Sequence, residues 1–221
     1  PAIIAALTPR TKIVWLCSPN NPTGTVVKSD ELQALLDAAP ATTAIVLDQA
    51  YCEFVDDPEY ADPLAFLRAG YRNVIALRSF SKSYALAGIR LGYAVADPVV
   101  CQMLDRISEP FFVSRTACAA GLAALDDDEW LASSTTSVHE GRETLTRELA
   151  ALGCDVIPSQ GNFVLVDTHR DCRELFQAML QKGVIVRPAD GWGYPTHIRV
   201  TVGLPEQNQR FLVALRELLT P

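Results

Sequence analysis

The sequence contains no hydrophobic run that approaches the roughly 18 to 20 residues needed to cross a membrane. Its first ten residues, PAIIAALTPR, also lack the basic flank and the long apolar core of a signal peptide. Positive charge is scarce, because 19 Lys and Arg side chains stand against 26 Asp and Glu side chains and give a net charge of −7. The sequence therefore predicts a cytoplasmic protein that binds neither a membrane nor a nucleic acid.

Disulfide and metal patterns are missing as well. The six cysteines are scattered and form no CxxC pair, which favours buried free thiols in a reducing compartment. His139, His169 and His197 show no ligand spacing with cysteine or carboxylate, so we expect no structural metal. Apolar residues make up 49% of the chain and charged residues 20%, which indicates a folded protein of one or two domains.

Short apolar runs alternate with helix-length periodic stretches through the first half of the chain, which is typical of a parallel α/β sheet. We expect strands at residues 13–17, 44–47, 74–77 and 92–96, and a helix capped by Ser29. Further on, the sequence predicts helices at 114–125, 126–153, 171–182 and 205–219, and strands at 162–166, 184–187 and 197–202. The predicted fold is therefore α/β: a partial large domain with a mostly parallel sheet (1–125) and a small C-terminal α+β domain (126–221).

Polar side chains follow three of the predicted strands at the point where each strand ends. Ligands in open α/β sheets lie outside the carboxyl ends of the strands, so these residues are the first candidates for a site. They are Asn21 after the first strand, Asp48 and Tyr51 after the second, and Ser79, Ser81 and Lys82 after the third. Taken singly, Asp48 could cap a helix, Asn21 could set a turn and Lys82 could be a solvated surface lysine. It is harder to explain in this way why all six residues occur together at the ends of three strands.

Four segments, in a fixed order, carry a resemblance to a known family: 18–24 (SPNNPTG), 48–54 (DQAYCEF), 79–93 (SFSKSYALAGIRLGY) and 198–203 (IRVTVG). Together they resemble the fold-type I pyridoxal-phosphate aminotransferases, in particular the histidinol-phosphate aminotransferase branch. The resemblance implies the PLP-dependent transferase fold, pyridoxal 5'-phosphate as cofactor, an amino donor and a 2-oxo acid as small-molecule substrates, and a homodimer. The implied reaction is transamination between histidinol phosphate and 2-oxoglutarate in histidine biosynthesis, through a Schiff-base lysine and a ping-pong mechanism.

The resemblance also implies roles for the residues around the cofactor ring. Lys82 would be the catalytic lysine, which holds the cofactor as a Schiff base and carries the proton between substrate and cofactor carbons. Asp48 would keep the ring nitrogen protonated, so that the ring can act as an electron sink. Asn21 and Tyr51 would stabilise the phenolic oxygen of the ring.

The cofactor phosphate is a dianion, for which hydroxyls and a guanidinium fork are suitable partners. Ser79, Ser81 and Arg90 match the positions of the family that contact this phosphate. Arg90 lies between Gly88 and Gly92, where the backbone can approach a ligand closely.

Two arginines and one asparagine are candidates for the substrate site. Arg199 alternates with apolar neighbours in a predicted strand, where an unpaired arginine would be costly, so it needs an anion. The resemblance makes that anion the carboxylate or phosphate of the substrate. Arg187 resembles a second anion-contacting arginine, with a structural salt bridge as the alternative. Asn162 matches a position near the substrate, with a turn before the strand as the alternative.

The sequence departs from the family pattern in three respects. Ser83-Tyr84-Ala85 stands where Ala-Tyr-Gly is more usual after the lysine. Gln49 replaces the glutamate that usually follows the cofactor aspartate, and the long N-terminal segment that family members carry before the first motif is not in this chain. The residues leave three alternatives open: an aromatic amino-acid (phenylalanine) aminotransferase, a decarboxylase of phosphate-bearing substrates with similar motifs, and a non-catalytic fragment of such an enzyme.

Overall fold

The computed structural model describes residues 1–219, and the chain divides into two compact units. The first unit comprises residues 1–19 and 26–131, and the second comprises residues 20–25 together with the chain from residue 132 onward. The division thus falls after Leu131, inside one continuous helix, whereas the sequence places a domain boundary after Leu125. The segment 20–25 belongs to the second unit although it follows the first strand.

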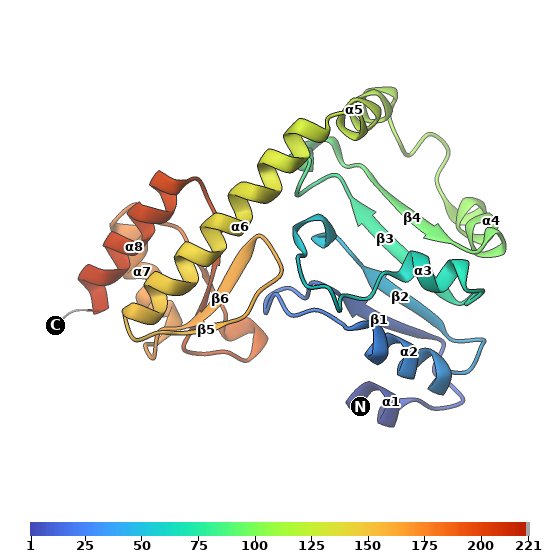
Figure 1. Ribbon diagram of the computed structural model, residues 1–221, viewed down its shortest axis with the longest axis horizontal. Helices are drawn as coiled ribbons and strands as arrows, with labels where there is room; N and C mark the ends of the chain where they lie inside the picture. The colour runs from blue at the N-terminus through green and yellow to red at the C-terminus, as the bar shows by residue number, and fades with distance from the viewer. Residues whose placement is uncertain (220–221) are drawn as a thin grey trace. The chain divides into compact units, whose positions relative to one another are not determined.

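Helices and strands alternate in the first unit (Figure 1). Its elements are α1 (Ala2–Ala6), β1 (Ile13–Cys17), α2 (Ser29–Ala38), β2 (Ala44–Asp48), α3 (Pro63–Arg68), β3 (Val74–Ser79), β4 (Gly92–Ala96), α4 (Pro98–Ile107) and α5 (Arg115–Leu125), with 3-10 turns at Cys52–Phe54 and Ala87–Ile89. The strands form one sheet in the order β1-β2-β3-β4. The first three strands are parallel and β4 is antiparallel to β3, so the predicted mostly parallel sheet is confirmed.

One face of this sheet is packed and the other carries the polar strand ends. Leu32, Leu35 and Leu36 of α2 form a core with apolar side chains of the sheet: Val14, Leu16, Ile45, Leu47 and Val74. Side chains alternate along a strand, so Asp48 points away from this core. Leu77 is its partner in the β2–β3 ladder, and Ser79, two residues on, shares the same face. The candidate residues of β2 and β3 therefore lie on one face at the carboxyl ends of both strands.

Helix α2 begins slightly differently from the prediction. Ser29 is its first residue rather than its cap, and the Ser29 hydroxyl donates to the Tyr60 carbonyl oxygen at 3.3 Å. The helix is capped instead by the Glu31 carboxylate, which accepts a hydrogen bond from the Lys28 amide at 3.0 Å. Acidic side chains in the first turn also suit the positive end of the helix dipole.

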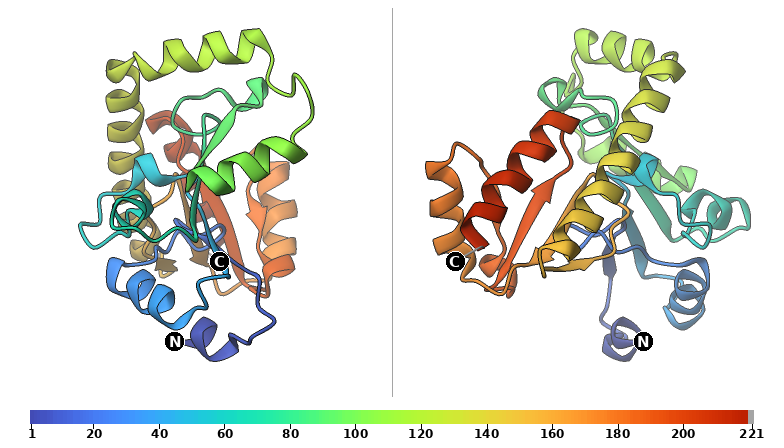
Figure 2. Two further views of the ribbon diagram at one scale, coloured as in Figure 1. Left: turned by 90° about the vertical axis from the view of Figure 1, so that its right-hand side faces the viewer. Right: turned by 60° about the vertical axis from the view of Figure 1, so that its left-hand side comes forward.

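The second unit is an antiparallel sheet with helices packed against it (Figure 2). Its elements are most of α6 (Asp128–Ala151), then β5 (Asp155–Ile157), β6 (Phe163–Asp167), α7 (Cys172–Gln181), β7 (Arg187–Pro188), the 3-10 turn Asp190–Trp192, β8 (His197–Thr201) and α8 (Pro205–Leu219). The strand order is β5-β6-β8-β7, and every neighbouring pair is antiparallel. This arrangement confirms the predicted α+β character.

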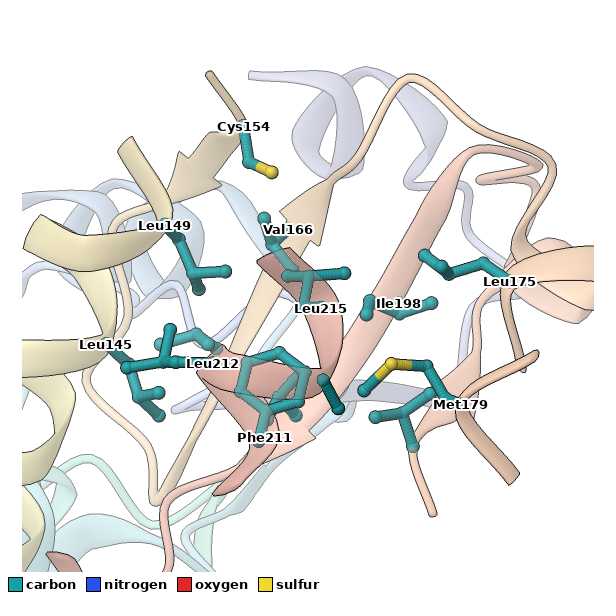
Figure 3. Close-up of a cluster of buried hydrophobic side chains, with 14 of the residues drawn as sticks. Leu145, Leu149, Cys154, Val166, Leu175, Met179, Ile198, Phe211, Leu212 and Leu215 are labelled. Carbon is teal, nitrogen blue, oxygen red and sulfur yellow. The ribbon is translucent and has the colours of Figure 1, made fainter. Parts of the chain in front are cut away.

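A single core holds the second unit together (Figure 3). It combines Leu145 and Leu149 of α6, Val166 of β6, Ile198 of β8, Leu175 and Met179 of α7, and Phe211, Leu212 and Leu215 of α8. Leu145 is fully buried, so truncating it to alanine should cost about 2 to 5 kcal/mol of stability. The core occupies one face of the sheet, and Arg199 lies on the opposite face with the buried side chains of Phe163 and Leu165.

The predicted strand at 184–187 is wrong over most of its length, since β7 contains only Arg187 and Pro188. Gly183 adopts a positive φ of 71°, and the Val184 amide donates to the Met179 carbonyl oxygen at 3.0 Å. These residues close the end of α7 and so cannot pair with β8. Helices α1 and α3 and strand β5 were not predicted, although Asp62, whose carboxylate accepts from the Leu64 amide at 3.0 Å, is an ordinary cap for α3.

The six cysteines are all free. Cys154 and Cys172 are buried as predicted, whereas Cys17, Cys52 and Cys101 are half-buried. Cys118 is exposed, because the buried residues of α5 are Ala117 and Gly121. Among residues 1–219, no helix combines the length and the apolar character needed to span a membrane.

Candidate active site

A polar pocket of about 340 Å³ lies at the carboxyl ends of β2 and β3 in the first unit. Four of the predicted cofactor residues line it, namely Asp48, Ser79, Ser81 and Arg90. The structure therefore brings together one carboxylate, two hydroxyls and one guanidinium from three separate segments of the chain. This set suits a ligand with an anionic group at one end and a cationic nitrogen at the other.

Asp48 is the last residue of β2 and is half-buried. Its Oδ1 accepts a hydrogen bond from the Ala50 amide at 3.0 Å, which fixes the carboxylate at the strand end. The second carboxylate oxygen stays available to a ligand in the pocket. A parallel strand ending in this way delivers its terminal side chain to the ligand side of the sheet.

Ser79 and Ser81 form a local turn, in which the Ser79 hydroxyl oxygen accepts a hydrogen bond from the Ser81 amide at 3.0 Å. Arg90 has a left-handed backbone (φ 59°) at the end of the 3-10 turn Ala87–Ile89. Its Nη1 donates to the Ala87 carbonyl oxygen at 2.8 Å, which leaves the other guanidinium N–H groups for an anion. Gly92 must stay small, because a Cβ there would lie 2.8 Å from the Arg78 carbonyl oxygen.

Lys82 lies beside Tyr51, and neither lines the pocket. The Lys82 Nζ is 5.2 Å from the centroid of the Tyr51 ring, a distance at which a cation is attracted to an aromatic face. Tyr51 is 7% exposed, whereas Lys82 is exposed to solvent. The loop that carries Lys82 is held by Trp130, whose indole Nε1 donates to the Ser83 carbonyl oxygen at 3.0 Å.

Behind the pocket, a buried chain of hydrogen bonds connects the ends of the strands. The Arg78 Nε donates to Gln49 Oε1 at 3.1 Å, and Gln49 Nε2 donates to the Tyr60 hydroxyl at 2.7 Å. The Tyr60 hydroxyl in turn donates to the Ser18 carbonyl oxygen at 2.8 Å, and burial raises the pKa of Tyr60. Gln49, a departure from the family pattern, therefore has a structural role that the sequence did not indicate.

The three predicted substrate residues and Asn21 all belong to the second unit. Arg199 Nη1 donates to Asn21 Oδ1 at 2.6 Å, and Arg187 lies directly opposite Arg199 in the β7–β8 ladder. The Asn162 carbonyl oxygen accepts from the Val202 amide at 2.9 Å, so the backbone of Asn162 extends the β6–β8 pairing. The substrate role of its side chain stays a prediction.

Trp192 contacts both arginines, although the sequence did not indicate it as a site residue. Its ring centroid is 5.5 Å from the Arg187 guanidinium carbon and 5.6 Å from that of Arg199. The Arg199 guanidinium carbon is also 5.3 Å from the centroid of the Phe163 ring. The only local signal was the turn Gly191-Trp192-Gly193, which does not by itself indicate a site.

Comparison with known proteins shows which family this chain is similar to. A family model described as aminotransferase class I and II matches residues 1–215. The chain is 47% identical over 218 residues to the histidinol-phosphate aminotransferase of Moorella thermoacetica, and 50% identical over 219 residues to that of Anaeromyxobacter sp. (strain Fw109-5). Each alignment covers 99% of this chain but only 56% and 60% of the respective relative.

The chain is also similar in structure to a solved histidinol-phosphate aminotransferase. The histidinol-phosphate aminotransferase from Sinorhizobium meliloti, crystallised in complex with pyridoxal-5'-phosphate, is similar with a TM-score of 0.85 and 31% sequence identity. The similarity covers 94% of this chain and 57% of that protein. Because the family model matches nearly the whole sequence, the chain belongs to the aminotransferase class I and II family.

Proposed function

We propose that the protein is a pyridoxal-phosphate-dependent aminotransferase that transfers the amino group of histidinol phosphate to 2-oxoglutarate. The observation that carries this proposal is the pocket lined by Asp48, Ser79, Ser81 and Arg90, whose groups fit the two ends of pyridoxal phosphate. The similarity to histidinol-phosphate aminotransferases supports the choice of substrate. The chain spans 56 to 60% of the length of these relatives. Their reaction is therefore a proposal for this chain.

Each pocket residue has a defined task in this proposal. When bound, pyridoxal phosphate supplies an electron sink for the negative charge that develops on the substrate carbon. The Asp48 carboxylate would favour the protonated form of the ring nitrogen, because a nearby anion stabilises the charged form of its partner. Ser79, Ser81 and Arg90 bind the phosphate dianion through charge-assisted hydrogen bonds, and the fixed turn of the two serines orients it.

Lys82 is proposed as the group that forms the covalent bond to the cofactor and then carries the proton. Lys82 would hold the bound cofactor, and its free amine next to the reacting carbon would move a proton as general acid and base. The Tyr51 ring, 5.2 Å from Nζ, limits the positions that the lysine chain can occupy. Asn21 and Tyr51 are the proposed donors to the phenolic oxygen of the cofactor.

Arg187 and Arg199 are the proposed anion-binding residues for the substrate, and Asn162 is a proposed third contact. The hydrogen bond to Asn21 orients the Arg199 guanidinium, and a guanidinium is a planar group suited to binding a carboxylate or phosphate. A 2-oxo acid enters the same site in the second half of a ping-pong reaction, which requires these arginines to accept a carboxylate as well.

We also propose that the enzyme works as a homodimer in the cytoplasm. The support for a second copy is a group of exposed apolar side chains at the end of α4 and just after it, in which Ile107, Phe111 and Phe112 are 79%, 98% and 70% exposed. Such a group of exposed side chains is common at protein interfaces. The support for a reducing compartment is that all six thiols are free. Sedimentation equilibrium tests the dimer, and a monomer at micromolar concentration would contradict it.

The substrate proposal is tested by single-turnover kinetics, in which the absorbance of the bound cofactor is followed after mixing with an amino donor. We expect histidinol phosphate to react faster than phenylalanine. The reverse order would assign the protein to the aromatic amino-acid aminotransferases, and release of carbon dioxide would assign it to the decarboxylases. No absorbance change with either donor would identify the chain as a non-catalytic fragment.

A further inference from the structure

Two positive side chains face each other in the second unit. Arg187 and Arg199 are direct partners in the antiparallel β7–β8 ladder, so their side chains leave the same face of the sheet. Like charges at such positions repel and destabilise the pair. Within the described part of the chain, no carboxylate forms an ion pair with Arg187. Arg187 is therefore stabilised beside Arg199 by something other than an ion pair of its own.

The ring of Trp192 provides that compensation. It lies 5.5 Å from the Arg187 guanidinium carbon and 5.6 Å from the Arg199 guanidinium carbon, both within the range of a cation–π interaction. A ring attracts cations through its quadrupole and carries no formal negative charge. An aspartate in this place would neutralise the arginines and occupy their N–H donors, whereas the ring leaves these donors usable.

Trp192 is held on a tight turn, so its ring is a fixed platform. The Trp192 and Tyr194 amides both donate to the Ala189 carbonyl oxygen, at 3.0 and 3.2 Å. Gly193 follows with a positive φ of 85°, which a glycine adopts without strain. The start of the turn is anchored by Asp190, whose carboxylate accepts from Arg173 Nε at 2.6 Å. Trp192 as a whole is 37% exposed.

We propose that Trp192 is a positioning residue for the substrate anion: it holds Arg187 and Arg199 side by side, so that both bind one doubly charged phosphate group. A dianion gains twice the Coulomb attraction of a monoanion at the same distance from the two guanidiniums. Trp192 thereby favours a phosphate-bearing amine over a donor that offers only a carboxylate. This inference rests on the proposed function and names the residue that sets its substrate preference.

The direct test is equilibrium binding of two probe anions, inorganic phosphate and acetate, measured by calorimetry. In Trp192→Leu, which keeps apolar volume but has no aromatic face, we expect phosphate binding to weaken about 5- to 30-fold and acetate binding to weaken less. Trp192→Phe keeps a ring and should restore most of the phosphate affinity. The matched control is Trp15→Leu, an exposed tryptophan of the first unit, which should bind both anions as the wild type does.

Kinetics supply a second readout. With histidinol phosphate as donor, Trp192→Leu should raise KM by a factor similar to the loss in phosphate affinity, with most of the effect in KM rather than in kcat. Equal weakening of phosphate and acetate, or wild-type phosphate binding by Trp192→Leu, would overturn the inference. If phosphate binding depends on Trp192 but the protein catalyses no transamination, the proposed function is wrong and the inference about Trp192 stands. If Trp192→Leu catalyses transamination with the KM and kcat of the wild type, the inference about Trp192 is wrong and the proposed function stands.

Discussion

The Arg199 guanidinium donates a hydrogen bond to the Asn21 side-chain oxygen at 2.6 Å, although the two residues are 178 positions apart. This contact explains why the segment 20–25 belongs to the second unit rather than to the unit whose strand precedes it. The same segment is held by the Gln160 amide, which donates to the Gly24 carbonyl oxygen at 2.8 Å. One predicted cofactor residue and one predicted substrate residue are thus oriented by each other.

Arg199→Lys keeps the positive charge but removes the planar fork that binds a carboxylate or phosphate through two N–H groups. We expect a loss of roughly 2 to 3 kcal/mol in transition-state binding, which is about a 30- to 150-fold lower kcat/KM. Steady-state kinetics measure this loss, and Arg216→Lys on α8 is the matched control. An unchanged kcat/KM would remove Arg199 from the substrate role.

Asp48→Asn should separate the charge of this residue from its structural contact. Asparagine can still accept the hydrogen bond of the Ala50 amide through Oδ1, so the strand end should keep its geometry. The loss of an ionic hydrogen bond of about 1.5 to 3 kcal/mol should lower kcat/KM by roughly 10- to 150-fold. Asp37→Asn, at an exposed position of α2, is the control. If both variants keep wild-type rates, Asp48 does not serve the cofactor.

Gly24→Ala tests the packing of the segment that carries Asn21. Gly24 has a positive φ of 77°, and a Cβ there would lie 2.0 Å from the Ser159 hydroxyl oxygen and 2.9 Å from the Ser159 Cα. Gly70→Ala is the matched control, because Gly70 has a φ of 99° but nothing within 4 Å of the added Cβ.

Both substitutions should lower the free energy of unfolding by about 1 to 2 kcal/mol, because alanine is strained in the left-handed conformation. Gly24→Ala should lower it by about 1 to 3 kcal/mol more through the steric clash. Urea unfolding measures the difference. Equal losses of stability would show that the segment moves aside freely, and that its contact with Ser159 does not fix Asn21.

The half-buried thiol of Cys52 makes the free energy of unfolding depend on pH in the alkaline range. Burial, with a smaller contribution from the Glu53 carboxylate, raises the pKa of Cys52 from its ordinary value of 9.0 to about 12. Between these values the unfolded chain releases a proton that the folded chain keeps. The contribution to stability is therefore complete below pH 9 and is lost as the pH rises towards 12, by at most about 1.4 kcal/mol per pH unit.

Urea unfolding at a series of pH values from 8 to 11 checks this dependence. Cys52→Ser should flatten the decline, since its hydroxyl does not titrate in this range, whereas Cys118→Ser at an exposed position should follow the wild type. Burial also raises the pKa of Tyr60, which leaves a residual slope at the highest pH values. Identical slopes in Cys52→Ser and wild type would contradict the assignment.

Local patterns in the sequence predicted those features that depend on neighbouring residues. The spacing of Leu32, Leu35 and Leu36 predicts the buried face of α2, and the strands that end at Asp48 and Ser79 follow from short apolar runs. The pocket at the carboxyl ends of these strands follows from the geometry of parallel sheets. Such features need no information about distant contacts.

Features that depend on contacts between residues far apart in the sequence could not be predicted from local patterns. The position of Trp192 beside Arg187 and Arg199 results from the register of β7 against β8 and from the following turn. The partner of Gln49 is Tyr60, which lies in a segment without regular periodicity. The shortening of β7 arises because the Val184 amide bonds to α7, an alternative that apolar spacing cannot distinguish from a strand.

The most direct test of the account locates the covalent bond between the protein and its proposed cofactor. The protein is incubated with pyridoxal phosphate, reduced with borohydride, digested and mapped by mass spectrometry. We predict that the pyridoxyl group is found on Lys82, that Lys82→Ala abolishes the label, and that Lys12→Ala, at an exposed lysine of the first unit, retains it. A label spread over surface lysines, or one that persists in Lys82→Ala, would contradict the account.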